Sequence, residues 1–384
     1  MKSLIAWAAL ALAGGAAAQS PGVTPNEIII ATIQDLSGPV AAYGKEARNG
    51  MQLRVDEINE QGGVQGRKLR LLVEDSGYDP KRAVLAAQKL LNQQGIFALV
   101  GSFGTPTSVA VMPMLLEGNV ISFLPLSSAR EMYEPFHRLK FSAASTYYDQ
   151  VRSTLPKLAG DKGAKKICVI YQDDDYGLDV VRATEAGAKT MSLPVMEKTS
   201  YKRGATDFSS QVARSKAAGC ELVVLATLAR ETVSVMTEAR KTDFNPVFLT
   251  TSGAYTDIVH KLGGKAVDGL YATMTVQHPY LDDATAPVRF WASKYKTRFN
   301  DDPGVLAVYG YEWVDMFIQA AQRAGPRLTT DSFVKAMESS PFGTDIFGSP
   351  VMRFTPTRRL GNELSRLSQI TDGRWKVVSD YVKP

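Results

Sequence analysis

The chain has 384 residues, 22% of them charged, and a formal net charge of +5 at pH 7. Its Lys and Arg residues are spread out without basic runs, a pattern that argues against nucleic-acid binding. The length exceeds what a single hydrophobic core usually supports, so we expect two packed lobes.

The first residues are typical of a secretory signal peptide. Lys2 precedes an apolar run, and small residues follow up to Ala16-Ala17-Ala18, which is the usual pattern before a cleavage site. The run is too short to span a bilayer. We therefore expect residues 1–18 to be removed, leaving a free periplasmic protein that begins near Gln19.

Strand-like and helix-like segments then alternate along most of the chain. We predict strands at EIIIATI, KLRLLVE, FALVGS, VISFLP and FSAAS, separated by helices over 45–60, 80–93 and 106–117. After Tyr147 the pattern restarts, with strands KICVIYQ, PVMEKTSY, ELVVLAT and PVFLTT and helices over 148–159, 178–191, 207–218 and 231–241. Such alternation predicts an α/β fold with two doubly wound, Rossmann-like lobes.

The last part of the chain differs. Helical patterns follow one another without strands between them, so these helices should pack on one of the two lobes: APVRFWASKYKTRF, LAVYGYEWVDMFIQAAQRAG and TDSFVKAMESS. Two strand patterns then flank Asp372-Gly373, a dipeptide that predicts a β-hairpin.

Cys168 and Cys220 are the two cysteines of the chain, one within a strand pattern and one just before another. An oxidising compartment would allow them to pair, but a disulfide requires Cα atoms within about 7 Å of each other. We expect two separate buried thiols.

Three segments of the first βαβ unit resemble a known family: DLSGPVAAYG, INEQGGVQGRKL and EDSGYDPKRAV. They resemble the branched-chain amino-acid-binding proteins of bacterial ABC transporters, which are type I periplasmic solute-binding proteins. The resemblance extends, with decreasing clarity, from about Glu27 to Tyr381. It implies two lobes joined by a three-crossing hinge, with the ligand bound between them.

The resemblance also implies the boundaries of the lobes. The first lobe would hold residues 24–143 plus 277–355, and the second would hold residues 144–276 plus 356–384. The three crossings would fall near Phe141–Ser145, Met274–Gln277 and Arg353–Gly361.

Gly104-Thr105-Pro106-Thr107 follows a predicted strand and opens a predicted helix. We expect Thr105 to be the N-cap, because Thr is favoured there and Pro is favoured at the next position. A carboxylate at this helix start would meet free N–H groups and the hydroxyls of Thr105 and Thr107. A purely structural cap is the alternative. The resemblance favours binding, since Thr105 occupies the position of the family's carboxylate-binding Ser.

Other candidate ligand contacts also come from the resemblance. It assigns Leu126 and Ser128 to a turn that meets the ligand's carboxylate and ammonium, and Ser127 replaces Ser128 if the register shifts by one residue. Tyr43 and Tyr176 match aromatic pocket positions, one on each lobe. Two such rings would cover an apolar ligand and exclude water. The alternative for each is an exposed tyrosine without a role.

Two positions depart from the family pattern. Ser252 stands where the family's second lobe places an acidic residue that holds the ligand's ammonium, and Leu228 stands where a Tyr is frequent. A buried ammonium without a counter-charge is costly. The ligand therefore either lacks the ammonium or meets another anion, such as Glu231 or Asp257.

The sequence contains no pattern of a catalytic triad, zinc site or cofactor site. Asp173-Asp174-Asp175 lacks the spacing of a calcium loop, so we interpret it as a helix-capping loop. We expect a monomeric binding protein, neither an enzyme nor a metal or cofactor carrier. It would capture a branched-chain amino acid or a related organic or aromatic acid by lobe closure and deliver it to an inner-membrane ABC permease. A sensor or ligand-presenting protein and an exported enzyme of the same fold are the alternatives.

Overall fold

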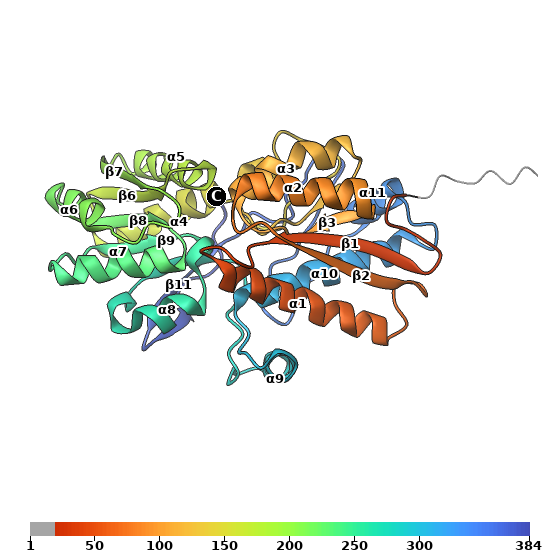
Figure 1. Ribbon diagram of the computed structural model, residues 1–384. Helices are drawn as coiled ribbons and strands as arrows, with labels where there is room; N and C mark the ends of the chain where they lie inside the picture. Colours follow the sequence, from red (N-terminus) through yellow and green to blue (C-terminus); the bar gives the residue numbers. More distant parts are fainter. Residues whose placement is uncertain (1–19) are drawn as a thin grey trace, which may run out of the picture.

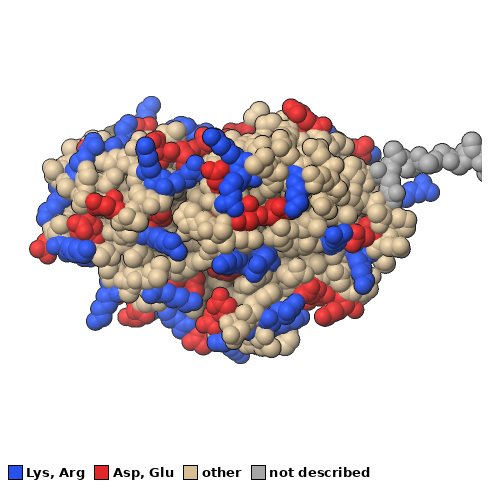
Figure 2. Space-filling view, viewed as in Figure 1, with Lys and Arg blue, Asp and Glu red and all other residues tan. Residues whose placement is uncertain are grey.

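The computed structural model describes residues 20–384, so the expected signal peptide lies outside the described residues. Two lobes lie side by side, each built on a sheet with helices on both faces (Figure 1). This arrangement confirms the expected α/β fold class. Among the described residues, no helix has the length and apolar character that crossing a membrane requires. Acidic and basic side chains are interspersed over the face seen in Figure 2.

The sheet of the first lobe has five parallel strands in the order β2-β1-β3-β4-β5. Its strands are β1 (Glu27–Gln34), β2 (Lys68–Asp75), β3 (Ala98–Val100), β4 (Ile121–Phe123) and β5 (Lys140–Phe141). Its connecting helices are α1 (Ala41–Glu60), α2 (Pro80–Lys89) and α3 (Thr105–Glu117). Because β1 lies between β2 and β3, the connections after β1 and β3 diverge, and a crevice opens at their carboxyl ends.

The sheet of the second lobe has seven strands in the order β12-β11-β10-β9-β8-β6-β7. The parallel ones are β6 (Ile167–Gln172), β7 (Val195–Tyr201), β8 (Leu222–Ala226), β9 (Val247–Thr250) and β10 (Tyr271–Met274). Its helices are α4 (Tyr147–Lys162), α5 (Asp175–Thr190), α6 (Ser209–Ala217), α7 (Ala229–Lys241) and α8 (Asp257–Gly263). Strands β11 (Arg366–Thr371) and β12 (Arg374–Val377) pair antiparallel around Asp372-Gly373, which confirms the predicted hairpin.

Three late helices return to the first lobe: α9 (Ala286–Phe299), α10 (Val305–Ala324) and α11 (Thr330–Ser339). Helix α10 packs along α1, as expected for helices without strands of their own. Glycines allow the close approach, because a Cβ on Gly310 would collide with the Ala47 carbonyl and one on Gly50 would collide with the Ala307 carbonyl. This packing brings one end of α10 to the space between the lobes.

Chain segments that pass between the two sheets are joined by backbone hydrogen bonds. Ser142 donates its N–H to Arg359 over 2.9 Å, and Gly361 donates to the Ser142 carbonyl over 2.9 Å. Gln277 donates to the Phe347 carbonyl over 2.9 Å. The lobes are thus connected by short paired segments.

Cys168 and Cys220 form a disulfide, so the expectation of two separate thiols is wrong. Cys168 lies in β6, and Cys220 comes just before β8. These strands are adjacent in the sheet although β7 separates them in sequence, which brings the two Cα atoms to 5.9 Å. The strand order that decides the pairing was not readable from the separate strand patterns.

Removing this bond should destabilise the second lobe. The disulfide closes a loop with a sequence separation of 52 residues, and such cross-links typically contribute about 2–4 kcal/mol. We expect the Cys168→Ala, Cys220→Ala double variant to unfold at a lower urea concentration than the oxidised wild type. Wild-type protein treated with a reductant is the control and should shift with it. Equal midpoints for oxidised and reduced wild type would show that the bond does not stabilise the second lobe.

Candidate functional site

A cavity lies between the lobes. Its walls come largely from segments that follow parallel strands, namely β3 and β4 of the first lobe and β6, β8 and β9 of the second. Seven of its twenty lining residues are aromatic, and none is Asp, Glu, Lys or Arg. The aromatic ones are Tyr43, Tyr78, Phe103, Tyr147, Tyr176, Tyr309 and Trp313. The cavity is therefore suited to an apolar ligand body.

Hydroxyl groups gather at one corner of the cavity, on the first lobe. Thr105 Oγ1 lies 2.8 Å from Ser127 Oγ, which also accepts the Ala129 N–H over 3.3 Å. Ser128 lines the same corner, and its N–H donates to no group within residues 20–384. The Ser128 N–H and the one hydroxyl proton that the Thr105–Ser127 pair does not use suit a carboxylate.

The expected N-cap role of Thr105 is wrong by one residue. Helix α3 begins at Thr105, and Gly104 is its N-cap with a φ of +93°. A Cβ at Gly104 would contact the Tyr78 ring, so the left-handed turn and the close ring both favour glycine there. Because it does not cap the helix, the Thr105 hydroxyl is left to pair with Ser127 at the cavity.

Two other predicted contacts lie differently from the expectation. The Thr107 hydroxyl donates to the carbonyls of Phe103 and Gly104, and Thr107 is not among the residues that line the cavity. Leu126 does line the cavity, but its N–H donates to Ser102 over 2.9 Å and its carbonyl accepts from Gly104 over 3.1 Å. Its backbone N–H is therefore engaged within the first lobe.

Tyr43 and Tyr176 both line the cavity, and their hydroxyls are engaged by the second lobe. Tyr43 reaches from α1, accepts the Ala229 N–H over 3.0 Å and donates to the Gly253 carbonyl over 3.1 Å. The Tyr176 hydroxyl donates to Thr227 over 3.3 Å and pairs with Thr251 Oγ1 over 2.8 Å. Both rings, rather than both hydroxyls, are available to a ligand.

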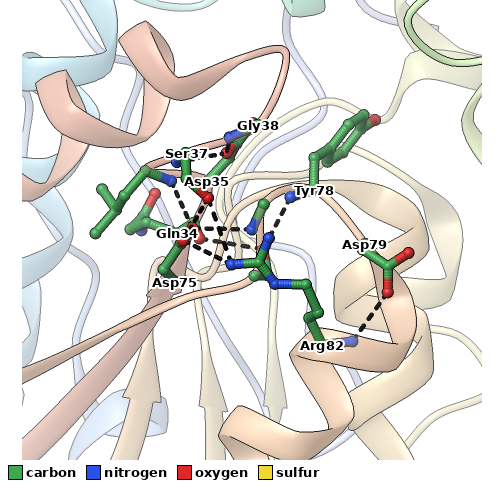
Figure 3. Close-up of polar contacts among 11 residues, drawn as sticks. Gln34, Asp35, Ser37, Gly38, Asp75, Tyr78, Asp79 and Arg82 are labelled. Atoms are coloured by element: carbon green, nitrogen blue, oxygen red, sulfur yellow. Dashed lines mark hydrogen bonds and ion pairs between the residues drawn. The ribbon is translucent and has the colours of Figure 1, made fainter.

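Loops after β1 and β2 hold the aromatic side chains of the first lobe in place. The Asp35 carboxylate accepts N–H groups from the turn that leads to α1 (Figure 3). Asp75 binds Ser37 of that turn and Arg82 of α2 over 2.6 and 2.7 Å. Burial opposes the charge on Asp75, but these bonds and two backbone N–H groups lower its pKa to about 2. The ionised carboxylate therefore ties together the loops that precede Tyr43 and Tyr78.

Several lining residues were missed by the sequence analysis. Tyr309 and Trp313 lie one turn apart on α10, and their rings stack with centroids 5.3 Å apart. Their i, i+4 spacing predicts that the two rings share one face of a helix. The spacing alone does not say that this face lines the cavity, which depends on the packing of α10 against α1. Tyr78, Phe103, Tyr147 and Leu306 also contribute to the wall.

Ser252 and Leu228 line the second-lobe side of the cavity. Ser252 Oγ accepts from Gln150 Nε2 over 3.0 Å. The two alternative anions, Glu231 and Asp257, are not among the lining residues, and Asp257 pairs with Lys261 of its own helix. No acidic side chain therefore faces the cavity from the described residues.

Comparison with known proteins places the chain in a family. A family model described as "Periplasmic binding protein" matches residues 27–374. The chain belongs to the periplasmic binding proteins. The match confirms the resemblance of the opening segments. This binding protein is similar to the Leu/Ile/Val-binding protein homolog 7 of Brucella melitensis, with 26% identity over 79% of this chain and 77% of that one. The Leu/Ile/Val-binding protein of Escherichia coli K12 is also 26% identical, over 65% of this chain and 67% of its own.

Solved structures show the same fold. A fatty acid ABC transporter substrate-binding protein from Thermomonospora curvata superposes with a TM-score of 0.86, at 23% identity over 95% of both chains. The branched-chain amino acid transporter substrate-binding protein LivJ from Streptococcus pneumoniae, solved with isoleucine, has a TM-score of 0.78 at 17% identity, covering 94% of this chain and all of that one.

Two carboxyl groups from opposite lobes meet near the start of α10. Glu46 of α1 accepts the Ala307 N–H over 3.0 Å. A Cβ on Gly304 would contact both Glu46 Oε1 and Oδ1 of Asp257, which belongs to α8. Burial raises the pKa of Glu46 to about 8, and the charge of Asp257 adds to the increase. Lys261 and His278 flank Asp257 and favour its ionised form.

Lobe contact should therefore weaken as pH rises. When the lobes separate, Glu46 loses the neighbouring charge of Asp257, so its pKa falls below the value of about 8 that it has in the closed arrangement. The closed arrangement binds this proton more tightly, so its advantage is present at low pH and is lost as pH rises through about 8. Small-angle X-ray scattering of the ligand-free protein should show a larger radius of gyration at about pH 9 than at about pH 5. Glu46→Gln should remove this dependence, and an equal change in that variant would contradict the assignment.

Proposed function

We propose that this protein is the substrate-binding component of an ABC importer and that its ligand is a small carboxylate with an apolar body and no α-ammonium. One observation carries the proposal: the cavity joins a hydroxyl-rich corner to aromatic walls without any acidic lining residue. An ammonium buried there would lack a counter-charge, a penalty of several kcal/mol. An apolar body gains about 25 cal/mol for each Å² removed from water.

The relatives support the two halves of this proposal differently. Those named Leu/Ile/Val-binding proteins support a ligand with a branched apolar side chain. The neighbour named as a fatty acid ABC transporter protein supports a carboxylate that carries no ammonium. The missing acidic residue at Ser252 favours the second kind of ligand for this chain.

Binding would proceed through lobe closure. The carboxylate first meets the hydroxyls and N–H groups at Thr105, Ser127 and Ser128, and the second lobe then covers the apolar body with Tyr176 and Leu228. Ligand contacts must favour the closed arrangement by more than its intrinsic penalty. The closed, monomeric form would then deliver the ligand from the periplasm to the inner-membrane permease.

A ligand screen tests the proposal directly. Matched pairs of an amino acid and its des-amino acid, such as leucine and 4-methylpentanoate, or phenylalanine and 3-phenylpropanoate, are added in a thermal-shift assay. We expect the des-amino acids to raise the melting temperature at least as much as the amino acids, because no buried ammonium must be paired. Stabilisation by leucine, isoleucine and valine alone would reject the proposal in favour of an amino-acid ligand.

The carboxylate corner is tested by Thr105→Val. Removing this hydroxyl should weaken binding of the best acid from the screen by about 1.5–3 kcal/mol, the usual loss for a hydrogen bond to a charged group. Titration calorimetry measures the change. Thr107→Val is the matched control on the same turn, because its hydroxyl bonds to the carbonyls of Phe103 and Gly104 and does not line the cavity. Equal losses in both variants would point to a general disturbance of α3.

A further inference from the structure

Gln150 of α4 fixes the direction of a hydrogen bond at the cavity wall. Its side chain is fully buried and makes four contacts. Nε2 donates to the Ser145 carbonyl over 2.8 Å and to Ser252 Oγ over 3.0 Å. Oε1 accepts the Ser252 N–H over 3.1 Å and the Thr273 hydroxyl over 2.7 Å.

The orientation of this amide has no alternative that satisfies its partners. The Ser145 carbonyl can only accept, and the Ser252 N–H can only donate. Turning the amide over would place Gln150 Oε1 against the Ser145 carbonyl, which is also an acceptor, and Nε2 against the Ser252 N–H, which is also a donor. Ser145 is buried and Ser252 is half-buried, so these unpaired groups would be costly. The amide nitrogen therefore faces Ser252 Oγ, and that oxygen acts as an acceptor.

The Ser252 proton is consequently free for a ligand. Its oxygen is engaged by Gln150, and within residues 20–384 its O–H donates to no acceptor. Ser252 lines the cavity. The second lobe thus presents a hydrogen-bond donor at the position where the family resemblance expects an acidic acceptor.

Neighbouring polar groups of the second lobe are bonded to other partners and do not accept the Ser252 proton. Tyr43 donates to the Gly253 carbonyl, and the Gly253 N–H donates to Thr251 over 3.1 Å. The Tyr176 hydroxyl donates to Thr227 and pairs with Thr251. These groups already have hydrogen-bonding partners. A ligand oxygen beside Ser252 would therefore meet the Ser252 hydroxyl as its hydrogen-bond donor.

We infer that the ligand is a 2-oxo acid with an apolar side chain, whose oxo oxygen accepts the Ser252 hydroxyl proton. This inference rests on the proposed function, because the carboxylate must occupy the corner at Thr105 and Ser128. The carbon next to the carboxylate then carries the group that faces Ser252. A carbonyl fits better than a hydroxyl there, since a ligand hydroxyl would bring a further proton that needs an acceptor.

Matched triplets of ligands test the inference in the wild-type protein. Titration calorimetry compares 4-methyl-2-oxopentanoate with 4-methylpentanoate and leucine, and phenylpyruvate with 3-phenylpropanoate and phenylalanine. We expect each 2-oxo acid to bind roughly three- to tenfold more tightly than its des-amino acid, as one neutral hydrogen bond provides. Equal affinities would overturn the inference and leave the proposed function standing. Failure of both acids to bind, with leucine bound, would overturn the proposed function itself.

Variants at Ser252 locate the preference. Ser252→Ala should bring the affinities for the 2-oxo acid and the des-amino acid together, whereas Ser252→Thr keeps a hydroxyl and should retain the preference for the 2-oxo acid. Ser252→Asp replaces the donor by an acceptor, so it should weaken 2-oxo acid binding and strengthen leucine binding. A preference that survives in Ser252→Ala, with the fold verified by its melting temperature, would assign the oxo group to another residue and overturn the inference.

Discussion

Every polar group that enters the space between the lobes must find a hydrogen-bonding partner there, because the enclosing walls are aromatic and uncharged. This constraint links the fold to the ligand. Donors of the first lobe suit a carboxylate, while on the second lobe the hydroxyls of Tyr43 and Tyr176 are already engaged. What a ligand can be is therefore set less by the shape of the cavity than by which donors and acceptors the protein leaves unfilled.

Helix α1 connects the chemistry of the cavity to the contact between the lobes. Tyr43 and Glu46 lie one turn apart on this helix. Tyr43 donates to the Gly253 carbonyl of the second lobe, and Glu46 lies near Asp257 of the second lobe. The same helix packs tightly on α10 through Gly50 and Gly310, and α10 contributes Tyr309 and Trp313 to the wall. A shift of α1 would thus change the aromatic wall and the lobe contact together.

Local sequence patterns predicted every strand except β10, most helices and the hairpin at Asp372-Gly373, because these depend on residues close in the chain. Tyr43, Tyr176, Ser252 and Leu228 were placed at the cavity by resemblance, and all four line it in the structure. Properties that depend on distant neighbours were less accessible. The pairing of Cys168 with Cys220 depends on the order of β6 and β8, and the direction of the Thr107 hydroxyl depends on the turn that Gly104 makes.

The disulfide lies wholly within the second lobe and does not connect the two lobes, so it stabilises one half of the molecule without restricting their relative movement. Thiols stay reduced in the cytosol and oxidise in the periplasm. For an exported chain, the newly synthesised second lobe would lack its cross-link during translocation, when a loosely folded chain is an advantage. The bond would then form only in the compartment where proteases and changing conditions make a durable fold useful.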